Sequence, residues 1–153
     1  MSQLMERPQH DEMRAQLLKA RQRVEVDALD YKRALKAAAA GGMTQREMAA
    51  LLGMSQPAVA KALQRAQAVP KVVGEFNAAS PYEVCQRYAA EFIDRAEVVR
   101  QLVAWPYKPT PWANEYGEYE ESLDGTWEEV GDALRHELID DAIYDEVLKK
   151  TAG

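Results

Sequence analysis

The sequence has little of what most enzymes, metal proteins and membrane proteins need. Its 153 residues contain one cysteine and two histidines. A single cysteine excludes an internal disulfide framework and favours a reducing compartment. His10 and His136 lie far apart in the sequence, and we find no Ser-His-Asp set, Cys-His set or glycine-rich phosphate loop. We therefore expect a non-enzyme without catalytic residues, metal ligands or a cofactor.

Long apolar runs are also missing. No stretch approaches the roughly 20 apolar residues that span a membrane, and the first ten residues lack the apolar core of a signal peptide. The composition, 47% hydrophobic and 29% charged, is ordinary for a globular chain of one or two small domains. We expect a cytoplasmic protein that has no membrane partner.

Charge is distributed unevenly. The net charge of the chain is −6, but residues 14–75 hold 11 Lys and Arg against 5 Asp and Glu, a net of +6. Residues 76–153 hold 7 against 17, a net of −10. A basic first half has the charge that a DNA-facing module needs, and the acidic second half indicates a separate role or partner.

Residues 11–40 contain no glycine or proline and many strong helix formers, so we expect one long helix that Gly41 and Gly42 end. Apolar residues recur along it at steps of three and four, at Met13, Leu17, Ala20, Val24, Ala28, Tyr31, Leu35 and Ala38. The last turns would complete a three-helix core with the helices that follow. The first turns would either pair with a second subunit or fold back against the C-terminal half.

Residues 44–65, TQREMAALLGMSQPAVAKALQR, predict two short helices. Thr44 and Glu47 have the spacing of a capping box, and Gly53 suits the left-handed conformation that ends a helix. Ser55 would cap the second helix, and Pro57 lies in its first turn, where the missing N–H costs little. Two helices joined by a glycine corner are typical of the helix-turn-helix.

These residues resemble the bacterial helix-turn-helix DNA-binding family, and SQPAVAKAL is similar to the recognition helix of LysR-type regulators. In that family the second helix lies in the major groove, and the first contacts phosphates. The resemblance implies contacts to double-stranded DNA from Thr44, Gln45, Arg46, Ser55, Gln56, Pro57, Ala60, Lys61, Gln64 and Arg65. Gln56 has the amide geometry to read adenine, and Lys61 reaches guanine or phosphate. A helical hairpin that never touches DNA is the structural alternative.

The acidic half contains an internal repeat. Residues 80–102 align with residues 126–148, with seven identities in 23 positions. Both copies predict a helical hairpin whose helices begin at Ser80, Asp94, Thr126 and Asp140, with Ser80 and Thr126 in capping boxes. Because such a unit cannot bury its own apolar face, the copies should pack against each other or on a partner. The copies resemble the short bihelical (SHOCT-like) modules of bacterial proteins, which implies oligomerisation or protein binding.

The segment between the copies, residues 104–125, is rich in proline, aromatic and acidic residues. Its rings would either clamp the two hairpins together or form a docking surface for a basic partner.

The chain is thus expected to be all-α, with a long helix and a helix-turn-helix in residues 11–69, a linker in 70–79 and an acidic repeat domain in 80–148. We expect a DNA-binding transcriptional regulator, a homodimeric repressor whose acidic half binds protein or oligomerises. One alternative is an antitoxin-like autorepressor whose acidic half neutralises a basic toxin. A helical adaptor that does not bind DNA is another.

Overall fold

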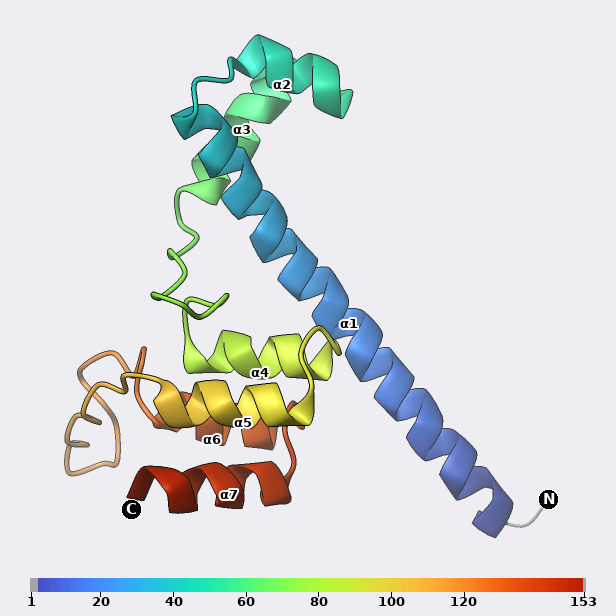
Figure 1. Ribbon diagram of the computed structural model, residues 1–153, viewed down its shortest axis with the longest axis vertical. Coiled ribbons are helices and arrows are strands. Elements are labelled where there is room, and N and C mark those ends of the chain that lie inside the picture. The colour runs from blue at the N-terminus through green and yellow to red at the C-terminus, as the bar shows by residue number, and fades with distance from the viewer. Residues whose placement is uncertain (1–2, 153) are drawn as a thin grey trace. The chain divides into compact units, whose positions relative to one another are not determined.

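The computed structural model describes residues 3–152, and within them the chain is all-helical without a strand, as expected (Figure 1). None of the helices in this part of the chain is both long and apolar enough to cross a membrane. The helices are α1 (Gln3–Ala40), α2 (Gln45–Leu52), α3 (Gln56–Ala66), α4 (Pro81–Ala89), α5 (Arg95–Ala104), α6 (Glu128–Arg135) and α7 (Asp141–Ala152).

Helix α1 is longer than predicted. It begins at Gln3 and includes Pro8, whereas we expected it to begin at residue 11. A proline this close to a helix start removes one backbone hydrogen bond and leaves all the later turns intact.

The chain forms two compact units, and their boundary lies inside α1. Val24–Lys71 form one unit, and the other contains the described residues up to Arg23 together with those from Val72 onward. The expected domain of residues 11–69 is therefore divided between the two. The expected linker, residues 70–79, is not a free connection either, because Phe76 and Ala78 are buried in the core of the repeat unit.

Helices α4 to α7 contain the repeat, and its two copies pack against each other. Helix α4 contacts its counterpart α6, and α5 contacts its counterpart α7. Self-matching contacts of this kind are what a twofold relation between two copies produces. The shared core is formed by Val84, Val98, Leu102, Trp105, Val130, Ile139, Ile143 and Val147.

The corners of the two hairpins repeat in detail. Glu91 and Glu137, 46 residues apart, both adopt the left-handed conformation with φ of 62°. The backbone N–H after each donates to a carbonyl five residues earlier, from Phe92 to Arg87 and from Leu138 to Ala133, at 2.9 Å. This 6→1 bond closes each first helix in the same way, so both corners have one geometry.

Of the four helix caps predicted in the two copies, three form and the fourth does not. Ser80, Asp94 and Asp140 accept from backbone N–H groups as expected. The predicted cap at Thr126 is wrong, because its hydroxyl donates to the carbonyl of Leu123 and α6 has no side-chain cap. Thr126 is buried, so its hydroxyl takes the nearest acceptor in the preceding turn.

A glutamate in the first turn of each copy reaches back to the segment before its helix. Glu83 accepts from the N–H of Ala79, and Glu129 accepts from that of Gly125, again 46 residues apart. Glu83 forms a buried ion pair with Arg87, but the second copy has Ala133 at the position of Arg87. Burial raises the pKa of the Glu129 carboxyl, although hydrogen bonds from the backbone of Gly125 and Tyr82 and from Ser80 lower it in part.

Replacing Glu129 by glutamine should stabilise the protein increasingly as pH rises. A carboxyl whose folded pKa is raised binds its proton more tightly when folded, so its contribution to stability falls as pH rises through that pKa. Glu97→Gln should show the opposite trend, because hydrogen bonds from Arg100 and Gln101 lower the pKa of Glu97 to about 2. Chemical denaturation of both variants and the parent from pH 2 to 8 would check this, with the Glu97→Gln effect falling between pH 2 and about 5, and parallel curves for the two variants would contradict it.

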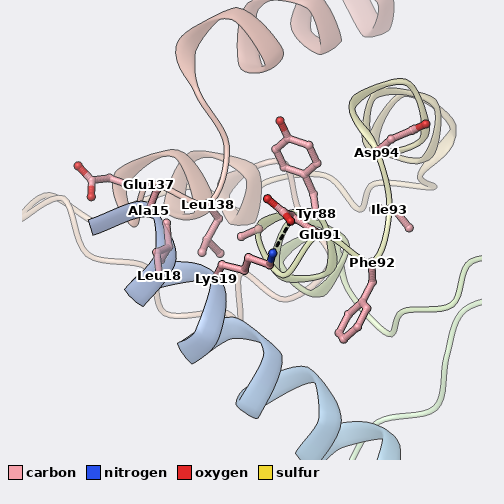
Figure 2. Close-up of a pocket in the computed structure, with 11 residues that line it drawn as sticks. Ala15, Leu18, Lys19, Tyr88, Glu91, Phe92, Ile93, Asp94, Glu137 and Leu138 are labelled. Carbon is pink, nitrogen blue, oxygen red and sulfur yellow. Dashed lines mark ion pairs between the residues drawn. The ribbon is translucent and has the colours of Figure 1, made fainter. Parts of the chain in front are cut away.

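The two corners also form ion pairs with α1 within the same compact unit. Lys19 pairs with Glu91 at 2.6 Å, and Arg14 pairs with Glu137 at 2.8 Å. Figure 2 shows Lys19 directed at Glu91 in a pocket of about 510 Å³ that Leu18 and Leu138 also line. Residues 11–23 therefore fold against the C-terminal half, which was one of the two expected arrangements.

The apolar stripe predicted along α1 is not the face that makes these contacts. Leu18, which packs on the repeat core, and the buried Gln22 lie outside the stripe. Six of the eight stripe residues are exposed, and the four large ones among them are 59% (Met13), 72% (Leu17), 63% (Val24) and 45% (Tyr31) accessible. Sequence periodicity identified an amphipathic helix, but the repeat unit packs on the neighbouring face.

Candidate nucleic-acid interface

Helices α2 and α3 and the turn between them are built as the sequence predicts. Thr44 accepts from the N–H of Glu47 at 3.1 Å and caps α2, and Ser55 accepts from that of Ala58 at 3.2 Å and caps α3. Gly53 has a φ of 64°, the left-handed conformation, and its N–H donates to the carbonyl of Ala49. An L side chain there would be strained, so the corner depends on glycine.

A small core fixes the angle between these helices. Met48, Ala49 and Val59 are buried, and Ala38 of α1 packs against them with Met54 and Leu63. The end of α3 is held by α1 as well. Arg33 donates to the carbonyl of Pro70 at 3.2 Å, and Lys36 donates to that of Val69 at 3.4 Å. The last turns of α1 thus supply the third helix of the expected three-helix core.

All ten residues assigned to DNA contact are exposed on α2, α3 and their caps. Thr44, Gln45 and Arg46 lie together at the start of α2. Ser55, Gln56, Pro57, Ala60, Lys61, Gln64 and Arg65 follow α3 from its cap to its last turn. Val59 and Ala66 of the same helix face inward and are buried. Alternation of this kind gives α3 one apolar face and one polar face that is accessible over its whole length.

Fewer basic side chains are available beside α2 and α3 than the net charge of residues 14–75 suggested. Of the basic residues in 14–75, Arg14 and Lys19 pair with glutamates of the repeat unit, and Arg33 and Lys36 bond to carbonyls beside α3. The exposed cations on or next to the two short helices are Arg46, Lys61, Arg65 and Lys71. Phosphate contacts would come from this small set.

This unit has an apolar groove that was not predicted from the sequence. The groove, of about 270 Å³, lies between α1 and α2 and is lined by Tyr31, Ala34, Leu35, Ala38, Met43, Met48, Leu51 and Leu52. Leu51 is 74% exposed at its rim. The adjacent leucines at the end of α2 were the available signal, since only one of two successive helix positions can face a core.

No group of three or more His, Cys, Asp or Glu side chains that could hold a metal ion is found among residues 7–152, whose side chains the structure describes. Cys85 is buried, and desolvation raises the pKa of its thiol. Comparison of the chain with protein-family models, with curated proteins and with solved structures finds no match.

Proposed function

We propose that this chain is a sequence-specific DNA-binding transcriptional regulator whose α3 lies in the major groove. The observation that carries the proposal is the pair α2–α3, with both helices capped, a left-handed glycine at the corner and a continuous polar face along the second helix. A helix of this kind fits the major groove, and its N-terminal residues then meet base edges.

The roles divide by chemistry. Gln56, in the first turn of α3, carries an amide that can donate to and accept from adenine. Arg46, Lys61 and Arg65 supply positive charge for phosphates, and the first turn of α2 offers backbone N–H groups beside Thr44. Three phosphate contacts per chain give a salt slope of roughly −3 on a logarithmic plot of affinity against salt concentration.

We include a homodimer in the proposal. Val24 and Tyr31 are exposed on α1 seven residues apart, which is the spacing of a helix–helix seam. The apolar groove beside α2 begins at Tyr31, so an apolar surface extends along α1 toward the DNA-binding helices. A dimer would read two half-sites and about double the salt slope.

The test is a fluorescence anisotropy titration of the full chain into duplex from its own upstream region and into scrambled duplex, at two salt concentrations. Lys61→Ala should weaken binding to both duplexes and lower the salt slope by about 1, whereas Gln56→Ala should relax the preference for the upstream duplex. If both variants bind as the parent does, α3 is not the DNA-reading helix. If the parent binds neither duplex, the helical adaptor becomes the better reading.

A second function is favoured by the charge of the repeat unit. Residues 76–153 carry a net of −10, which opposes binding to nucleic acid and suits a basic protein. An antitoxin-like autorepressor would combine both activities, DNA binding through α3 and neutralisation of a basic partner through the acidic half.

A further inference from the structure

The connection between α5 and α6 is a closed loop with its own structure. Lys108 donates its N–H to the carbonyl of Gly125 at 2.9 Å and pairs with Thr126, so the two ends of residues 109–124 meet. Figure 1 shows this connection extending away from α5 and α6. Long ordered loops of this kind, closed at the base, are uncommon in compact domains and usually carry a function.

Aromatic residues at the base and at the tip of this loop behave differently. Trp105 is buried against Phe76, with ring centroids 4.8 Å apart, and Tyr107 packs edge-on against Trp127 at 5.4 Å. These rings clamp the hairpins. Trp112, in contrast, is 96% exposed, and Tyr116 is 80% exposed. The segment therefore clamps the hairpins at its base and exposes aromatic rings at its tip.

The tip is held in one conformation by its own hydrogen bonds. The Asn114 side chain accepts from the N–H groups of Tyr116 and Glu118, both at 2.9 Å. Gly117 has a φ of 79° and donates to the carbonyl of Asn114, while Ala113 pairs with Tyr119. Trp112 thus precedes a closed turn. An exposed ring on an ordered backbone loses little conformational entropy when a partner covers it.

The tip is acidic. Glu115, Glu118, Glu120 and Glu121 are exposed, and no ion pair joins them to any lysine or arginine in the described chain. Residues 109–134 contain no lysine or arginine at all. Four carboxylates repel nucleic acid, and the face of a tryptophan ring attracts cations.

We propose that the tip, residues 112–121, binds an arginine- or lysine-rich segment of a partner protein. The ring face of Trp112 receives a guanidinium or ammonium group, and the surrounding glutamates pair with the neighbouring cations. Tryptophan is the most favourable ring for such a contact and is enriched among residues that dominate binding energy. The inference deepens the second function above and is independent of DNA binding by α3.

The experiment uses the full chain and a short fluorescent peptide in which arginine alternates with serine, with a glutamine-for-arginine peptide as a blank. The parent should bind the arginine peptide and not the blank. Trp112→Ala should weaken binding about tenfold, and Trp112→Phe should lose less because it keeps a ring. The side chain is exposed, so neither change should disturb folding, which circular dichroism would verify.

A matched pair of variants separates the tip from the overall acidity of the chain. Glu118→Gln with Glu120→Gln should weaken peptide binding, whereas Asp141→Asn with Asp145→Asn, the same charge change on exposed positions of α7, should not. Equal losses in both, or parental affinity in Trp112→Ala, would overturn the proposal. Binding of single-stranded DNA that depends on Trp112 would also overturn it. Duplex titrations of Trp112→Ala report on the DNA function separately.

Discussion

Replacing both Lys61 and Arg65 by glutamate should reduce affinity for duplex DNA by at least about a hundredfold. Both residues are exposed on α3, on the polar face that we place against DNA. The change removes two phosphate contacts and sets two carboxylates against the backbone, and like charges at an interface cost several kcal/mol, each 1.4 kcal/mol being a factor of ten. Anisotropy titrations at one fixed salt concentration would measure the loss.

The control for this variant carries the same charge change in the other unit. Lys149 and Lys150 are exposed in the last turn of α7, and their replacement by glutamate alters the net charge of the chain equally. If the loss of affinity depends on where the charges lie, this control should bind DNA almost as the parent does. A comparable loss in both variants would mean that only the total charge of the chain matters and would remove α3 from the interface.

The features that sequence predicted best depend on neighbouring residues alone. The caps at Thr44, Ser55, Ser80 and Asp94 and the turn at Gly53 each need only a side chain and the backbone within a few positions. The repeat was predictable for the same reason, since equal sequences at equal spacing fold alike. Even the left-handed glutamates at the two corners are among its identical positions.

Features that depend on tertiary packing were not predictable. The stripe on α1 identified an amphipathic helix, but only the repeat unit decides that Leu18 packs on its core while Leu17 stays exposed. Thr126 has the spacing of a cap, yet burial turns its hydroxyl to Leu123. The exposure of the candidate site residues followed from helix periodicity. The pairing of Arg14 and Lys19, outside that set, with distant glutamates did not follow from it.

Replacing Arg87 by alanine should lower the free energy of unfolding by roughly 3–5 kcal/mol, the usual cost of leaving one member of a buried ion pair without its partner. The Arg87 guanidinium donates to Glu83 at 3.0 and 3.2 Å, and both side chains are almost fully buried in α4. Arg135→Ala is the contrast, because its pair with Asp132 is exposed and should contribute at most about 1 kcal/mol. Chemical denaturation would measure both.

The second copy suggests how the loss can be reversed. In the second copy, Ala133 follows Glu129 by four residues, which is the arrangement that Arg87→Ala would create around Glu83. Glu129 is only partly buried. Adding Glu83→Gln to Arg87→Ala removes the buried charge and keeps an oxygen that can accept from Ala79. The double variant should therefore recover much of the lost stability, because an unpaired buried charge, more than the missing contact, accounts for the cost. If the double variant is no more stable than Arg87→Ala, the guanidinium acts mainly by packing within α4.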